Sequence, residues 1–464
     1  MDATFSRRAL LARATGGFGA IALAGLLAEQ ASAGDIDPLS PRRPHFEPKA
    51  KRVIFLYMTG GVSHVDSFDP KPLLMAGHGK SITVDNWQGK KGSYQRYFKR
   101  PDWGFAPGGR CGTEVSDLFP CIRERADDLC VIRSMTTDHT NHYESTLGMH
   151  SGSFSFARPS LGAWVSYGLG TENRNLPSFM VLAPAAPYAG TQTWASDFLP
   201  GCHQGTHVVP GPTPIPNVRP RVAVESRQRR ELELVARADR RHLAERPGEA
   251  ALEARIKSFE TAFGMQKEAP EAFDLSGESD DTLALYGLAR GQTTGFGWQC
   301  LVGRRLAERG VRFVELIDTG SSSNWDSHAN MKDHAGLARN VDRPIAGLLL
   351  DLERRGLLED TLVVWTTEFG RTPYHEQAGH AGREHHHQAF STWLAGGGIK
   401  GGIVHGATDD YGVAVARDRV HVHDLHATIL HQLGLDHERL TYRHVGRDYR
   451  LTDVSGEVVR AILA

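Results

Sequence analysis

The 464-residue chain has only five cysteines, and none of them forms a Cys-x-x-Cys pair. Without such a pair, modules that hold zinc with paired thiolates are excluded. Basic residues are not in excess either: 53 Lys and Arg stand against 54 Asp and Glu, a formal net charge of -1. We therefore expect no nucleic-acid partner, because such binding needs a broad basic surface. Long apolar runs are missing after the N-terminal region, so we expect no membrane span in the mature chain.

The residues that are abundant indicate a globular protein with metal chemistry. Hydrophobic residues make up 40% of the chain and there are eight Trp, which is ample material for a large core. The chain also has 23 His. Together with the scarcity of thiols, this number favours a metal site with imidazole and carboxylate ligands.

The first 33 residues have the pattern of a cleaved export signal. A twin-arginine segment at Ser6-Arg7-Arg8 precedes an apolar stretch from Gly16 to Leu27, and Ala31-Ser32-Ala33 is a small-x-small cleavage box. The apolar stretch is too short and too weakly hydrophobic for a membrane anchor. We therefore expect a twin-arginine signal peptide over 1–33 and a periplasmic or secreted mature protein that begins near Gly34. Residues 34–50 are Pro-rich and are interpreted as a linker.

From residue 51 to 464 the pattern predicts one α/β domain. Short apolar runs without polar alternation are typical of strands buried on both faces of a mostly parallel sheet. Helical patterns between the runs, at 296–309 and 341–356, indicate an open, doubly wound arrangement. The runs are Val53–Met58, Leu129–Arg133, Phe179–Leu182, Val311–Ile317, Thr361–Thr366 and Phe390–Leu394.

Two further segments stand apart from this alternation. Residues 222–265 are rich in Arg, Glu, Ala and Leu at helical spacing, which predicts a helical insertion with a solvated charged face. The stretch from Trp87 to Arg110 is rich in Gly, Lys and aromatic residues and is interpreted as a long surface loop. Cys111 and Cys121 are close enough in sequence for a local disulfide, although separate thiols fit equally well.

Polar clusters follow most of the expected strands. Open α/β sheets bind ligands beyond the carboxyl ends of their strands, so clusters from distant positions are expected to meet there. Each cluster has a simpler explanation when taken alone: an Asp-x-His pair can be a helix cap, and Glu368 can pair with a nearby arginine. The clusters contain His64 and Asp66; Asn141 and His142; Asp326 and His328; Glu368 and Arg371; and Arg383 with His385.

Several of these motifs together resemble the exported bacterial domain-of-unknown-function family 1501, over about residues 51–464. That family is placed in the alkaline phosphatase superfamily, and its members are often labelled sulfatases. The resemblance implies an alkaline phosphatase-like fold. The motifs are Gly60–Pro72, Asn141-His142, Trp325-Asp326-Ser327-His328, Glu368-Phe369-Gly370-Arg371-Thr372-Pro373, Gly382-Arg383-Glu384-His385 and Ala395–Gly402.

The resemblance also implies metal ligands. Asp326, His328 and His385 match the superfamily's metal residues best, and Glu368 keeps a carboxylate where the superfamily has Asp-His-Gly. His64 and Asp66 stand on a longer loop in place of the usual first Asp. A divalent ion is implied, either zinc, manganese or magnesium; one ion is expected, because the second site has lost a His ligand.

The resemblance implies roles for four further residues. Asn141 and His142 occupy the place of the superfamily's nucleophile, and they are expected to touch the ester or the attacking group. Arg371 and Arg383 are expected to neutralise the ester oxygens. No Cys or nearby Ser fits the Cys/Ser-x-Pro-x-Arg motif, so formylglycine sulfatase chemistry is not expected.

The resulting hypothesis is an exported metal-dependent hydrolase of phosphate or sulfate esters, acting on a small-molecule or glycan substrate. The alternative is a non-catalytic envelope protein that uses the same scaffold to bind a glycan or a protein partner. The missing nucleophile favours the alternative, whereas the retained Asp and His residues favour the hydrolase. The sequence leaves the oligomeric state open.

Overall fold

A computed structural model describes residues 37–85, 91–219, 225–246, 249–320 and 324–464. The expected signal peptide over 1–33 lies outside these ranges. No helix in the described part of the chain is both long enough and apolar enough to span a membrane.

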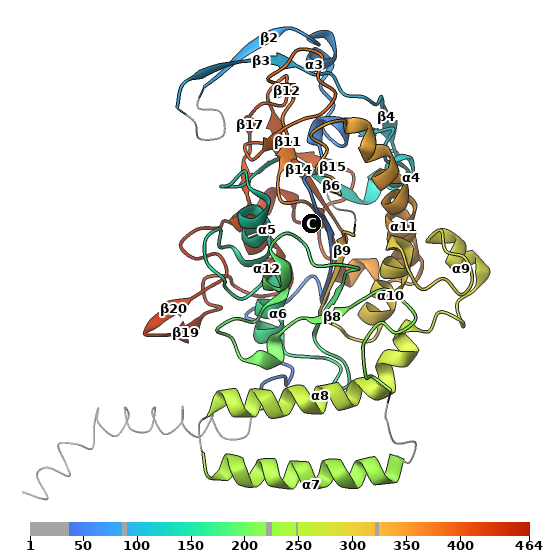
Figure 1. Ribbon diagram of the computed structural model, residues 1–464, viewed down its shortest axis with the longest axis vertical. Coiled ribbons are helices and arrows are strands. Elements are labelled where there is room, and N and C mark those ends of the chain that lie inside the picture. Colours follow the sequence, from blue (N-terminus) through green and yellow to red (C-terminus); the bar gives the residue numbers. More distant parts are fainter. Residues whose placement is uncertain (1–36, 86–90, 220–224, 247–248, 321–323) are drawn as a thin grey trace, which may run out of the picture.

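A nine-stranded sheet forms the centre of the molecule (Figure 1). All its pairings are parallel except those of β14, which runs antiparallel to both neighbours. All six expected strands belong to this sheet, which confirms the α/β class with a mostly parallel sheet. The order is β15 (Ile403–His405), β6 (Leu129–Thr136), β14 (Phe390–Ala395), β10 (Thr361–Thr366), β1 (Arg52–Met58), β9 (Phe313–Asp318), β7 (Phe179–Leu182) and β8 (Thr206–Val208), with β18 (Val420–His421) beside β6.

Helices cover both faces of the sheet, and each face has its own apolar core (Figure 1). In β1, Ile54, Leu56 and Met58 belong to one core, and Val53 and Phe55 belong to the other. Successive side chains of a strand point to opposite faces, so an apolar run without alternation is buried on both sides. The first core packs on α4 (Pro120–Glu124), α10 (Phe296–Glu308) and α11 (His334–Arg354), and the second on α5 (His142–Ser151), α6 (Leu161–Leu169) and α12 (Val422–Gln432).

The helical insertion consists of α7 (Glu225–Ala244) and α8 (Ala250–Phe273), which lie side by side at one end of the molecule (Figure 1). The second helix extends beyond the expected limit at 265. Met265, Ala269 and Ala272 explain the difference, because they repeat at helical spacing and are buried in the core beside α10. None of the α7 side chains whose burial is described is buried.

The expectation of a surface loop over 87–110 is wrong in part. Its described residues include β3 (Ser93–Phe98), which pairs with β2 (Ser81–Asp85) and β12 (Tyr374–His375), and β4 (Phe105–Gly108), which pairs with β5 (Thr113–Ser116). In the β2–β3 hairpin, Phe98 is buried in a small apolar cluster of its own. Side-chain burial alternates along these two strands. The composition of the segment, rich in Gly, Lys and aromatic residues, concealed this alternation in the sequence.

The remaining elements are short. Residues 37–50, the described part of the expected linker, lie against the domain: Leu39 and Ala50 are buried, and the His45 amide donates to the Gly434 carbonyl at 2.9 Å. All five cysteines are free thiols. The other short elements are α3 (Pro72–Ala76), α9 (Asp280–Leu285), β11 (Gly370–Arg371), β13 (His385–His386), β16 (Ala407–Thr408), β17 (Val415–Arg417), β19 (Tyr442–His444) and β20 (Arg447–Tyr449).

Candidate metal centre

Four histidine and carboxylate side chains meet at one edge of the sheet. His142 opens α5 after β6, and Asp326 and His328 lie in the segment after β9. His385 precedes β14, and because β14 is antiparallel to its neighbours, its start lies at the edge where the others end. The parallel sheet with one reversed strand therefore gathers residues from three distant parts of the chain.

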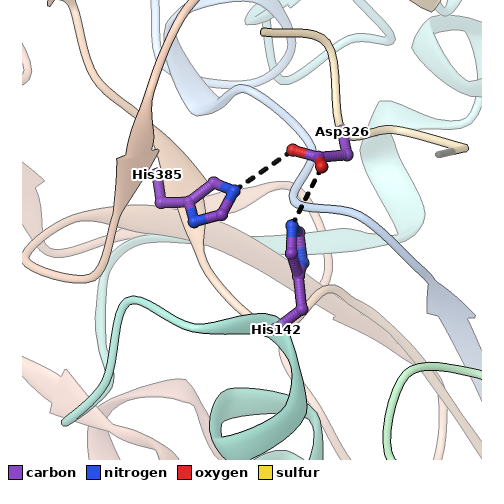
Figure 2. Close-up of side chains that lie close together, drawn as sticks. All are labelled: His142, Asp326 and His385. Carbon is purple, nitrogen blue, oxygen red and sulfur yellow. Dashed lines mark hydrogen bonds and ion pairs between the residues drawn. The ribbon is translucent and has the colours of Figure 1, made fainter.

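Asp326 lies at the middle of this cluster (Figure 2). Its Oδ1 is 2.9 Å from His328 Nε2 and 3.1 Å from His385 Nε2, and its Oδ2 is 3.2 Å from His142 Nε2. The two Nε2 atoms of His328 and His385 are 2.9 Å apart. The ligand atoms of Asp326, His328 and His385 thus lie 2.9 to 3.1 Å from one another, close enough to share one ion.

In each of the three imidazole rings, the nitrogen that does not face Asp326 donates a hydrogen bond to an acceptor on the far side of the ring. Since Nδ1 donates outward, Nε2 is the nitrogen that faces Asp326, as in metal-bound histidines oriented by an outer carboxylate or carbonyl. The three bonds are His142 Nδ1 to Glu368 Oε1 at 2.7 Å, His328 Nδ1 to Glu384 Oε2 at 3.1 Å, and His385 Nδ1 to the Thr140 carbonyl at 2.6 Å.

The charges of the cluster are strongly coupled. Burial opposes ionisation of Asp326, but the three histidine rings and Arg371 outweigh it and hold the pKa of that carboxyl well below its usual range. Contacts with Asp326 and Glu384 raise the pKa of His328 to about 9. Burial lowers the pKa of His385, whereas the carboxylates beside His142 outweigh its burial and raise its pKa. The centre therefore attracts cations, either protons or a metal ion.

The donor set fits a divalent metal. Ligand atoms of His142, Asp326 and His385 all lie within 4.8 Å of one another. Nε2 of His142 is buried and makes no hydrogen bond, which leaves it able to coordinate an ion. Imidazole nitrogens with one carboxylate oxygen suit zinc, whereas magnesium prefers oxygen ligands throughout.

Glu368, expected to be a ligand, is a supporting residue in this arrangement. It is fully buried behind His142, and its Oε1 also accepts from the Gly60 amide at 2.7 Å. Its Oε2 accepts from the Tyr57 hydroxyl at 3.2 Å and from Thr367 Oγ1 at 3.0 Å. The hydrogen bond and charge of His142, together with backbone amides, outweigh burial and lower the pKa of Glu368, so the carboxylate stays charged and oriented.

Asp66 and His64 are not brought to the cluster, so their expected role as ligands has no support in the geometry. Asp66 is fully buried and accepts from Arg383 Nε at 2.7 Å and from Ser63 Oγ at 2.6 Å. His64 is buried too, and its Nε2 donates to the Gly412 carbonyl at 2.9 Å. Asp66 lies away from the cluster because the buried guanidinium of Arg383 requires a carboxylate partner.

The two arginines expected to face the ester are both buried and have their donors engaged within the protein. Arg371 donates to Asp326 and to the carbonyls of Gly60, Gly61 and Arg383. Besides Asp66, Arg383 donates to the carbonyls of Lys99, Arg100 and Thr372, each at 3.1 Å. Both side chains therefore hold loops and carboxylates in place.

Asn141 is the N-cap of α5. Its side-chain oxygen accepts from the Tyr143 amide at 3.0 Å, which stabilises the helix that carries His142. The expected contact between Asn141 and an ester stays a prediction.

Sequence reasoning missed three residues at the centre. Glu384 accepts a hydrogen bond from His328. Its position beside His385 in the motif Gly382-Arg383-Glu384-His385 could have indicated that it belongs to the centre. Tyr188 stacks on the His142 ring with centroids 4.1 Å apart, and no motif indicated it. Gly382 allows two loops to touch, because a Cβ there would lie 1.5 Å from the His328 carbonyl oxygen.

A family described as "Protein of unknown function (DUF1501)" matches residues 50–463. The chain belongs to this family. No curated protein matches this DUF1501 chain.

Solved structures similar to this DUF1501 chain share little sequence with it. Lipoteichoic acid synthase LtaP from Listeria monocytogenes is 8% identical, over 91% of this chain and 80% of that one, with a TM-score of 0.39. PsFucS1 sulfatase from Pseudoalteromonas sp. is 13% identical, over 90% and 72%, with a TM-score of 0.36. A protein in the alkaline phosphatase superfamily from Vibrio parahaemolyticus is 9% identical, over 88% and 73%, with a TM-score of 0.37.

Proposed function

We propose that this DUF1501 chain is a metal-dependent hydrolase of phosphate or sulfate esters, with a small-molecule or glycan ester as substrate. One observation carries the proposal: three imidazole Nε2 atoms converge on one carboxylate, and each ring is oriented by an outer acceptor. The motifs that resemble the alkaline phosphatase superfamily supply the reaction class.

His142, Asp326, His328 and His385 would hold one divalent ion, most suitably zinc. When bound, the ion polarises an ester oxygen and lowers the pKa of an attacking water. Within the described residues, the one group whose ligand atoms all lie within 4.8 Å of one another is His142, Asp326 and His385, which supports a single ion.

The protein's own residues orient this centre. Arg371 fixes Asp326 through an ion pair, and Glu368 fixes the His142 ring. Among the described residues, no Ser, Thr or Cys side chain bonds to Asp326 or to the three histidines; Ser145, near the place of the usual nucleophile, donates instead to the His139 carbonyl at 2.7 Å. We therefore propose water as the attacking group.

One observation favours the alternative of a non-catalytic binding protein. The donors of Arg371 and Arg383 are engaged within the protein, so neither arginine is available to neutralise an ester. A hydrolase built this way depends on the ion alone for charge stabilisation. We expect slow turnover, and a binding protein would show none.

The test is turnover of p-nitrophenyl phosphate and p-nitrophenyl sulfate by the purified protein, before and after chelation and after zinc is restored. The hydrolase predicts a slow activity that chelation abolishes and zinc recovers. His385→Ala should lack it, and His387→Ala, its neighbour in the same His triplet, should retain it. Bound metal without turnover would favour the binding protein.

We also propose export to the periplasm or beyond by the twin-arginine route. The support is the pattern of residues 1–33 in the sequence.

A further inference from the structure

The Glu384 carboxylate lies on the side of His328 that faces away from Asp326, and it contacts two imidazole rings. Its Oε2 accepts from His328 Nδ1 at 3.1 Å, and its Oε1 lies 3.3 Å from His375 Nε2. Because Nδ1 of His375 accepts from the Gln377 amide at 3.1 Å, the neutral His375 ring carries its proton on Nε2, facing Glu384. Both rings thus present a proton to the one carboxylate.

His328 depends on this carboxylate more than the other two rings of the centre depend on theirs. Its side chain is 40% exposed, against 11% for His142 and 17% for His385. His142 stacks on Tyr188, and His385 packs on Phe369 with ring centroids 4.6 Å apart. Among the described residues, His328 has a ring contact with His385 alone, at 4.7 Å. Packing therefore restrains the His328 ring least.

Glu384 is itself held by its backbone. Its amide donates to Thr372 Oγ1 at 3.1 Å, and its carbonyl accepts from the Thr372 amide at 2.9 Å. It also lies between two anchored neighbours, the buried Arg383 and His385 of β13. The backbone that carries the carboxylate is therefore held in place, so the carboxylate can orient the less tightly packed His328 ring.

We propose that Glu384 is a positioning residue that keeps Nε2 of His328 directed at Asp326 and thereby raises the affinity of the centre for a divalent ion. This inference rests on the proposed function, because it concerns the same ion. Loss of the carboxylate would leave Nδ1 of His328 without its acceptor and allow the exposed ring to turn.

The experiment measures the zinc dissociation constant of the full chain by competition with a chromophoric chelator. Replacing partners behind metal-bound histidines costs about 10 to 100-fold in affinity, and we expect a loss in that range for Glu384→Ala. Glu384→Gln should lose less, because its side-chain carbonyl can still accept one N–H. Glu376→Gln, which removes an exposed carboxylate from the same loop, should bind as wild type does.

Cobalt spectra distinguish positioning from a general loss of structure. We expect the visible bands of the cobalt-loaded protein to change in Glu384→Ala while its far-ultraviolet circular dichroism stays unchanged. If wild type binds zinc tightly and the Glu384 variants match it within twofold, the inference is overturned and the proposed function stands. If wild type binds no zinc, both are overturned.

Discussion

Replacement of Asp66 by Asn tests whether this carboxylate is a structural counter-ion or a metal ligand. Asp66 and Arg383 are both fully buried and lie 2.7 Å apart, so the substitution leaves a buried guanidinium without its charge partner. Breaking such a pair from one side costs about 3 to 5 kcal/mol. We expect the urea midpoint of Asp66→Asn to fall accordingly, with its metal content unchanged.

The pH dependence of stability gives an independent measure of the same contact. The pKa of Asp66 is lowered from 3.8 to about 2, because the Arg383 charge and its hydrogen bond outweigh burial. A folded pKa below the unfolded one stabilises the protein above about pH 4, and the contribution is lost as the pH falls through the folded value. The shift corresponds to roughly 2 kcal/mol at neutral pH.

Urea titrations followed by circular dichroism provide the assay. Asp410→Asn, at an exposed carboxylate, is the control and should leave the midpoint unchanged. The double variant with Arg383→Met should lose less stability than the sum of its single changes, because removing both charges leaves neither unpaired. A stable Asp66→Asn protein that has lost its metal would refute the reasoning and restore Asp66 as a ligand.

Three further outcomes follow from the structure. Tyr57→Phe removes a buried hydroxyl that donates to Glu368, and urea unfolding should show a loss of about 1 to 2 kcal/mol; an unchanged midpoint would contradict the bond. Gly382→Ala should weaken zinc binding in a chelator competition, because its Cβ would displace the His328 carbonyl; wild-type affinity would show that the loops need no such contact. N-terminal sequencing of periplasmic material should begin near Gly34, and an intact N-terminus would contradict export.

The sequence predicts the sheet well because burial on both faces leaves a plain signal. Val363 and Val364 of β10, for example, belong to opposite cores, so their run shows no polar alternation. The end of α8 is harder to predict, because Met265 and Ala269 continue the helix only by packing on a neighbour that the local pattern does not include.

For the candidate site, the sequence predicts which metal-binding side chains meet, but it does not predict which arginines pair with buried carboxylates. The edge of a parallel sheet brings Asp326, His328 and His385 together, and the polar clusters after the predicted strands, with the family resemblance, were enough to expect it. Residue type does not reveal whether an arginine faces solvent or neutralises a buried carboxylate. Arg383 and Asp66, far apart in sequence, satisfy each other, and this pairing exists only in the folded chain.

The most direct test of the account is elemental analysis of the purified wild-type protein beside Asp326→Asn, His385→Ala and the control His387→Ala. The account predicts about one divalent ion per chain in wild type and in the control, and none in the other two variants. Absence of metal from wild type after incubation with zinc, or equal metal in all four proteins, would contradict it.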